Sequence, residues 1–196
     1  MKGMPHADPY PVLISAVLST RTRDTVTSQA SRRLLGRAPD PRRLAALAPG
    51  TIEELIFPVG FYHTKARILP ALGRALSRLG RVPRTIEKLT ALPGVGRKVA
   101  NIVLAQGFSI PAIAVDTHVH RISNRLGLVK TRRPEDTERK LMEILPRRYW
   151  LDWNRLLVAH GQTVCRPQRP ECGACAISRW CLRVGVKRSP VPRARS

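Results

Sequence analysis

The fold of this chain is organised around residues 91–101, which read Ala-Leu-Pro-Gly-Val-Gly-Arg-Lys-Val-Ala-Asn. Pro93-Gly94 is a strong turn signal, and Gly96 lets the backbone turn again before a helix that we expect to begin at about Arg97. Two glycines ahead of a helix N-terminus leave unpaired N–H groups that suit a phosphate. The same pattern would also serve an ordinary turn between two helices, so this stretch alone leaves both interpretations open.

Helical patterns continue outward from this stretch in both directions. Residues 10–20 predict a short buried helix, and residues 62–79 predict a long helix with apolar side chains on one side. Asp116 stands where an N-cap would begin a further helix, to residue 126. No alternating run between turn signals reads as a strand, so the predicted fold class is all-α. At 196 residues the chain fits one large or two small domains.

Two earlier helix starts are also predicted from capping residues. Asp24 is a plausible N-cap for a helix to residue 35. Thr51, followed three residues later by Glu54, resembles a capping box.

The charge balance points to a polyanionic partner. The chain has 35 Lys and Arg against 13 Asp and Glu, a net charge of +22, and nucleic acid is the first candidate for a surface of this sign. An anionic membrane surface is the alternative, but no segment is both strongly amphipathic and rich in lysine. Residues 182–196 carry five basic and no acidic residues with two prolines, which predicts a disordered basic tail.

Neither a targeting segment nor a membrane span is evident in the sequence. The apolar run at residues 12–18 is short and is preceded by His6 and Asp8 rather than by basic residues. Nothing approaches the roughly 20 apolar residues that a membrane span needs. We therefore expect a cytoplasmic protein, where thiols stay reduced.

All four cysteines fall close together, at Cys165, Cys172, Cys175 and Cys181, with the spacing C-x6-C-x2-C-x5-C. In a reducing compartment this pattern favours a metal site over two disulfides. Four thiolates can hold a structural zinc ion or an iron–sulfur cluster. Zinc sites usually offer two tight cysteine pairs and only one is tight here, so the spacing favours the cluster without excluding zinc.

Three motifs taken together resemble one family. Residues 92–98, Leu-Pro-Gly-Val-Gly-Arg-Lys, are followed by residues 115–118, Val-Asp-Thr-His, and then by the cysteine pattern. In this order they resemble the endonuclease III branch of the helix–hairpin–helix DNA glycosylases, and the resemblance spans about residues 10–181. It implies a [4Fe–4S] cluster on the four cysteines. It also implies two helical domains with the active site in the cleft between them: a helical barrel at 10–110, whose hairpin is at 92–96, and a cluster domain at 111–196.

The resemblance implies a role for each motif. The hairpin, here Leu92, Gly94, Val95 and Gly96, would bind a DNA phosphate. Lys98 would be the nucleophile and Asp116 the essential carboxylate. Because relatives that only remove a base carry another residue at the Lys98 position, a lysine there implies a bifunctional glycosylase and abasic-site (AP) lyase. Arg166 and Arg169 beside the cysteines would contact phosphates.

Two further positions depart from the family pattern. Arg21 falls where endonuclease III members often have Gln to fill the gap left by a flipped base, and Phe61 falls where a Leu wedge often sits. An arginine would hydrogen-bond the orphaned base differently and could favour guanine, and a larger apolar wedge is a reasonable substitute. A phosphate contact for Arg21 and a core position for Phe61 are the simpler alternatives. Relatives also usually begin with a further helix that packs on the cluster domain.

The sequence thus predicts a monomeric base excision repair enzyme that acts on damaged bases and abasic sites in duplex DNA. Oxidised or ring-saturated pyrimidines are the expected substrates. A mismatch or adenine glycosylase without lyase activity is the nearest alternative, and residue 98 argues against it. A DNA-binding protein that uses hairpin and cluster only for recognition is the alternative from another class.

Overall fold

The computed structural model describes residues 8–186, and these residues form helices and no strand, which confirms the predicted all-α class. The chain divides into two compact units between Ala114 and Val115. Each unit is a separate set of packed helices. Of the predicted basic tail, the part from residue 187 onward lies outside the described residues.

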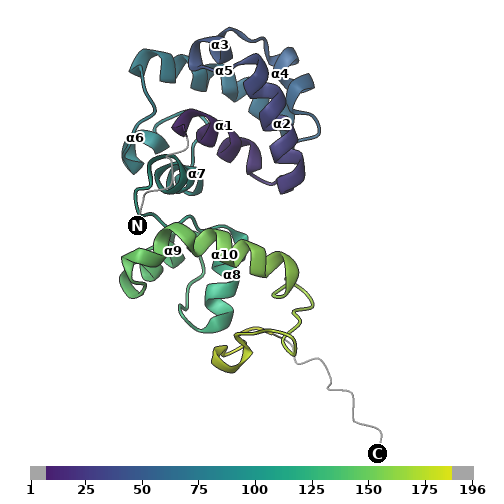
Figure 1. Ribbon diagram of the computed structural model, residues 1–196, viewed down its shortest axis with the longest axis vertical. Helices are drawn as coiled ribbons and strands as arrows, with labels where there is room; N and C mark the ends of the chain where they lie inside the picture. Colours follow the sequence, from purple (N-terminus) through teal and green to yellow (C-terminus); the bar gives the residue numbers. More distant parts are fainter. Residues whose placement is uncertain (1–7, 187–196) are drawn as a thin grey trace, which may run out of the picture. The chain divides into compact units, whose positions relative to one another are not determined.

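The first unit contains one helix longer than the rest, α5 Tyr62–Leu79, and several shorter ones (Figure 1). In chain order they are α1 Pro9–Ser19, α2 Asp24–Arg37, α3 Pro41–Ala46, α4 Pro49–Ile56, α5 Tyr62–Leu79, α6 Ile86–Thr90, α7 Arg97–Ile102 and the π-helix η1 Val103–Gly107.

The core of the first unit contains buried side chains from both α1 and α5. The predicted burial of α1 is confirmed, since Leu13, Ile14 and Leu18 are fully buried. Helix α1 packs against α2, α7 and η1, while α5 packs against α3 and α4. Burial of apolar surface contributes about 25 cal/mol for each Å² removed from water, and it is the main term that stabilises this unit.

Helix α5 has the predicted bounds and a buried stripe at helical spacing. Lys65, Leu69, Leu72 and Leu76 all lie on this stripe. Gly73 allows the close approach of α3, because a Cβ at residue 73 would lie 2.6 Å from the Ala45 backbone nitrogen. The C-terminal half of α5 therefore packs against α3, and Lys65 near its N-terminus contacts the loop before α2.

The second unit packs its helices around Val119, Ile122, Leu141 and Leu157, which are buried. The elements of this unit are α8 Thr117–Leu126, α9 Pro134–Ile144, the short 3-10 helix η2 Arg147–Tyr149, α10 Trp150–Thr163 and the 3-10 turn η3 Ser178–Trp180. Helix α10 lies against α8, and α8 lies against α9.

Two predicted helix starts are wrong in detail. Helix α4 begins at Pro49 with Ala48 as its N-cap, so Thr51 lies inside the helix and forms no capping box. Proline at the first helical position already has the required φ and needs no N–H partner, which explains the earlier start. Helix α2 is capped by Arg23, and Asp24 is its first residue.

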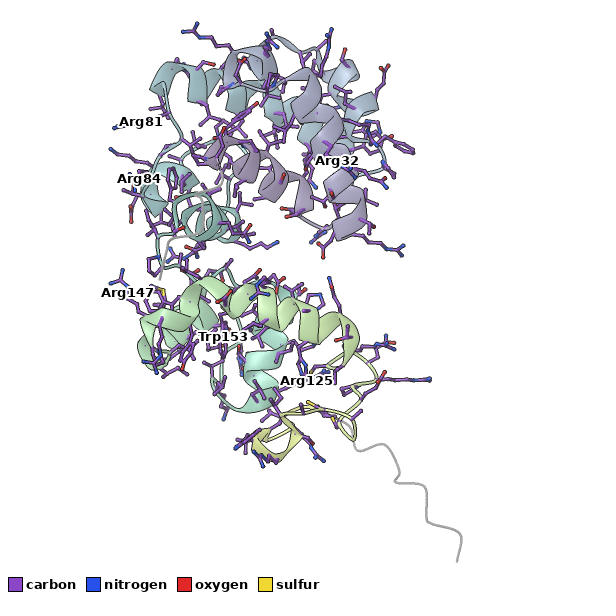
Figure 2. All side chains as sticks on the ribbon, in the orientation of Figure 1. Arg32, Arg81, Arg84, Arg125, Arg147 and Trp153 are labelled. Carbon is purple, nitrogen blue, oxygen red and sulfur yellow. The ribbon has the colours of Figure 1, made fainter. Side chains whose placement is uncertain are left out.

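Basic side chains are distributed over both units (Figure 2). Arg32, Arg81 and Arg147 are exposed, whereas Arg125 is buried.

Within residues 8–186, no helix is long and apolar enough to cross a membrane.

Candidate functional site

The turn between α6 and α7 has two bare glycines, as predicted. Gly94 has φ +75°, and a Cβ there would lie 2.6 Å from Ile68 Cγ2, so this position requires glycine. Gly96 is the N-cap of α7 and has open space around it. In the described part of the chain, the N–H groups of Gly94 and Gly96 have no acceptor. Two exposed, unpaired N–H groups beside a helix N-terminus can receive an anion.

Leu92 and Val95, which belong to the same predicted phosphate site, have buried side chains. They anchor the turn in the core of the first unit, and the Val95 N–H donates to the Leu92 carbonyl at 3.1 Å. Only backbone atoms of these two residues can therefore face a ligand.

Lys98 lies in the first turn of α7, two residues after Gly96, and is half-buried. A second lysine, Lys65 on α5, is close enough for the two charges to act on each other. Burial, and secondarily the charge of Lys98, lowers the pKa of Lys65 to about 8. The hairpin thus brings one partly accessible amine beside a buried one.

Lys65 is a residue that the sequence reasoning missed. Its Nζ donates to the carbonyl oxygens of Leu18 at 2.8 Å and Thr20 at 2.7 Å, which lie at the end of α1 and in the following loop. Its position on the apolar stripe of α5 was the available signal, because a lysine there must bury its amine and find acceptors.

Arg21 and Phe61, distant in sequence, lie against each other in the structure. The Arg21 guanidinium carbon is 5.2 Å from the Phe61 ring centroid. Both residues have left-handed backbones, with φ of 54° and 58°, which is rare for side-chain-bearing residues. Gly60 permits this arrangement, because a Cβ there would lie 2.2 Å from the Arg21 carbonyl oxygen.

These two residues border a pocket that reaches the hairpin. The pocket has a volume of about 280 Å³ and is lined by Val17, Thr20, Arg21, Phe61, Thr64, Lys65, Ile68 and Gly94. Phe61 is 60% exposed, so the alternative of a core aromatic is wrong. An exposed aromatic ring on a left-handed residue beside this pocket is suited to contact with a nucleic-acid base.

Asp116 is the N-cap of α8, as predicted. One carboxylate oxygen, Oδ1, accepts from the backbone N–H groups of His118 at 2.9 Å and Val119 at 2.8 Å. The side chain is half-buried. Because both bonds use the same oxygen, the cap orients the carboxylate and leaves its second oxygen available.

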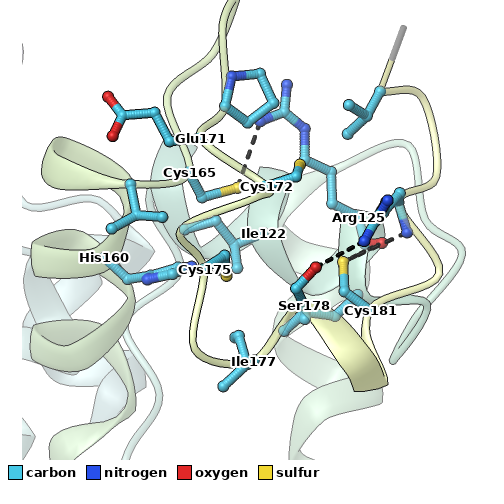
Figure 3. A pocket seen from close by; sticks show the side chains of 15 residues that line it. Ile122, Arg125, His160, Cys165, Glu171, Cys172, Cys175, Ile177, Ser178 and Cys181 are labelled. Carbon is cyan, nitrogen blue, oxygen red and sulfur yellow. Dashed lines mark hydrogen bonds between the residues drawn. The ribbon is translucent and has the colours of Figure 1, made fainter. Parts of the chain in front are cut away.

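The four cysteines are reduced and gather around one pocket in the second unit (Figure 3). Arg125 Nη1 donates to Cys165 Sγ at 3.4 Å, and His160 Nε2 lies 3.7 Å from Cys175 Sγ. Ile122 and Ile177 supply apolar walls. Within residues 8–186, no group of three or more His, Cys, Asp or Glu side chains is arranged to hold a single metal ion. Four thiols around one pocket are a donor set that an iron–sulfur cluster or a structural zinc ion can use.

The two arginines predicted to contact phosphates stand on the loop between the first two cysteines. Arg166 is exposed and lies 3.5 Å from Glu171, which partly neutralises it. Arg169 is exposed and forms no ion pair with any described residue. Arg169 is therefore the more available cation of the two.

Comparisons with known proteins agree on one group. Residues 14–147 match the family described as HhH-GPD superfamily base excision DNA repair protein. The chain is 49% identical to endonuclease III of Thermotoga maritima over 176 residues, 89% of this chain and 83% of that protein. It is 42% identical to endonuclease III-like protein 1 of Bos taurus over 177 residues, 88% of this chain and 58% of that longer protein.

The solved structures give the same result. A trapped endonuclease III–DNA covalent intermediate, an estranged-adenine complex, superposes with a TM-score of 0.85 at 35% identity, covering 92% of this chain and 86% of that one. A thermostable thymine-DNA glycosylase superposes with a TM-score of 0.78 at 25% identity, covering 89% and 83%.

Proposed function

The chain belongs to the endonuclease III family within the HhH-GPD superfamily of base excision DNA repair proteins, and we propose from this premise that it is a bifunctional DNA glycosylase and AP lyase. Its substrate is duplex DNA that contains an oxidised pyrimidine or an abasic site. The proposal is supported most directly by the placement of Lys98, which follows Gly94 by four residues and Gly96 by two, close to their unpaired N–H groups. A phosphate held by these groups brings the adjoining sugar within reach of an amine in the first turn of α7.

The reaction begins with extrusion of the damaged nucleotide, because C1′ cannot be attacked while the base is stacked, and damage lowers the cost of unstacking. The neutral amine of Lys98 then forms a bond to C1′ as the bond from C1′ to the base breaks. The base leaves with the electron pair and takes a proton. Loss of a proton from the nitrogen and opening of the sugar ring give a Schiff base between Lys98 and C1′.

The second step cleaves the strand. The protonated Schiff base acidifies the C2′ hydrogen, and its removal as a proton expels the 3′ oxygen with the electron pair of the C3′–O bond. This β-elimination cuts the strand 3′ to the lesion. Water then hydrolyses the Schiff base and regenerates the Lys98 amine.

Asp116 stabilises the positive charge that develops on the sugar as the base departs. Hydrogen bonds from the His118 and Val119 N–H groups hold the carboxylate in one orientation. Its negative charge is therefore oriented before the reaction begins. The same carboxylate can carry the protons that the two steps release.

Arg21 and Phe61 occupy the space vacated by the extruded nucleotide. Their left-handed backbones and mutual stacking support this role, because the pair projects from the fold without needing to rearrange. The guanidinium can donate to O6 and N7 of a guanine opposite the lesion. Leu92 and Val95 hold the hairpin, while Arg166 and Arg169 contact the phosphate backbone.

The cofactor is a [4Fe–4S] cluster bound by Cys165, Cys172, Cys175 and Cys181. The reduced thiols around one pocket and the donor from Arg125 support this assignment. A bound cluster supplies four covalent anchors to a segment with little regular structure. Its contribution to function is to hold the loop that carries Arg166 and Arg169.

A nicking assay with separate detection of the released base tests the function. Wild type is expected to release thymine glycol and cut the strand, and to cut an abasic duplex, while leaving undamaged duplex intact. Lys98→Gln should abolish both events, and Lys130→Gln, which removes an exposed lysine of the second unit, should leave them unchanged. Base release without cutting would indicate a monofunctional glycosylase, and tight binding with neither event would indicate a non-enzymatic DNA-binding protein.

A further inference from the structure

Away from the hairpin, the first unit has a second concave basic surface, between α3 and α5. It is lined by Arg42, Ala45, Arg74, Ser77 and Arg78, and its volume is about 410 Å³. None of these residues takes part in the proposed reaction. We propose that this pocket, here called the arginine pocket, is a second phosphate-binding site.

The geometry of the helices gathers the three guanidinium groups. Arg74 and Arg78 are four residues apart on α5 and therefore share one helix face. Gly73 lets α3 approach within van der Waals distance, and a Cβ there would meet the Pro41 carbonyl oxygen at 2.8 Å. Arg42 of α3 is thereby brought to the same hollow.

The charges in the arginine pocket are not neutralised by any residue between 8 and 186. Arg42, Arg74 and Arg78 are exposed, and none forms a hydrogen bond or ion pair with another described residue. The neighbouring Arg43 is different, since its Nε lies 3.6 Å from Asp40 Oδ2. Like charges four residues apart destabilise a helix slightly, and a bound anion would reverse this cost.

Ser77 supplies an independent observation. Ser77 lines the arginine pocket, and its Oγ is one of five buried side-chain polar atoms that have no hydrogen-bond partner among the described residues. Buried hydroxyl groups usually have a hydrogen-bond partner, and Ser77 is the one of these five residues that lines the arginine pocket. Guanidinium forks and a hydroxyl are the donor set that a phosphate group prefers.

The arginine pocket is separate from the hairpin. Ile68 of α5 contacts the hairpin glycine Gly94, and Arg74 and Arg78 follow it by six and ten residues. At a rise of 1.5 Å per residue they lie roughly 9 and 15 Å farther along the helix axis. The phosphate can come from a second segment of nucleic acid or from a free polyphosphate, and these two sources are separable by experiment.

Calorimetric titration with inorganic tripolyphosphate tests the site itself. The variant Arg42→Gln/Arg74→Gln/Arg78→Gln is compared with Arg32→Gln/Arg37→Gln/Arg132→Gln, which removes the same charge from three exposed arginines that do not line the arginine pocket. We expect the pocket variant to bind at least roughly tenfold more weakly or to lose one class of sites, because hydrogen bonds from charged donors to phosphate oxygens are stronger than neutral ones. The control should resemble wild type. Equal changes in both variants, or no change in either, would overturn the proposal.

The salt dependence of binding to undamaged duplex identifies the source of the phosphate. If nucleic acid occupies the arginine pocket, the slope of log K against log salt falls by about 0.9 for each phosphate that the pocket variant no longer neutralises. If tripolyphosphate binding disappears while this slope stays at the control value, the ligand is a free polyphosphate. Circular dichroism shows whether the triple variant is folded. The single variant Arg78→Gln should lose tripolyphosphate affinity in the same direction but to a smaller extent, which excludes misfolding as the cause. Cutting of abasic duplex by the pocket variant should persist, so failure of this proposal is distinguishable from failure of the proposed function.

Discussion

The ammonium group of Lys65 lies 2.7 Å from the carbonyl oxygen of Thr20 and donates a hydrogen bond to it. This bond joins α5 to the loop that carries Arg21. A buried lysine in this position has two consequences, since it supports the loop and also makes stability depend on pH.

The pH dependence is predictable in sign. Burial lowers the pKa of Lys65 to about 8, against 10.5 for an ordinary lysine. Between these values the unfolded chain binds the proton and the folded chain releases it, so stability rises with pH in this window and the contribution is lost as pH falls through 8. The free energy of unfolding of wild type relative to Lys65→Met should therefore rise by on the order of 1–3 kcal/mol between pH 8 and 10.5. Chemical denaturation at several pH values measures this difference, and a flat profile would refute the assignment.

Gly60 should be intolerant of a side chain. Gly60→Ala would place a Cβ 2.2 Å from the Arg21 carbonyl oxygen, and we expect a loss of about 1–3 kcal/mol because backbone must shift. Gly36→Ala is the matched control, since nothing lies within 4 Å of that site in α2 and alanine should stabilise the helix by about 0.5–1 kcal/mol. Thermal unfolding distinguishes the two, and equal effects would show that the close approach is not limiting.

Asp116 is expected to have separable capping and catalytic roles. Asparagine caps helices about as well as aspartate, whereas alanine costs about 1 kcal/mol. Asp116→Asn should therefore keep the stability of wild type but lose most of its cutting activity, while Asp116→Ala should lose both. Full activity in Asp116→Asn would reduce this residue to a cap.

Replacement of one cysteine tests the metal centre. Cys172→Ser should lower the iron and sulfide content, bleach the brown colour and destabilise the 165–181 segment, because a cluster needs all four thiolates. Elemental analysis and visible absorption provide the measurement. A colourless wild-type protein with one zinc ion and no sulfide would contradict the proposed cofactor.

Much of the fold was predictable because its signals are local. The bounds of α5 follow from an apolar stripe between a glycine-containing turn and Gly80, and the cap at Asp116 follows from its position before an amphipathic run. The start of α4 was predicted wrongly because Thr51 competes with Pro49, and proline at the first position takes precedence.

The parts that could not be predicted depend on contacts between distant residues. The stacking of Arg21 on Phe61 joins positions forty residues apart, and no local pattern specifies it. The acceptors of Lys65 are backbone carbonyl oxygens of α1 and its following loop, which have no side-chain signature. Neither of these two contacts can be recognised from a short stretch of sequence.

Reductive trapping tests the covalent bond between Lys98 and the sugar most directly. Wild type incubated with abasic duplex and borohydride should form a stable protein–DNA complex, and peptide mapping should locate the adduct on Lys98. Lys98→Gln should give no complex, while Lys130→Gln should match wild type. Tight DNA binding by wild type without a trapped complex, or an adduct that maps to another lysine such as Lys65, would contradict the account.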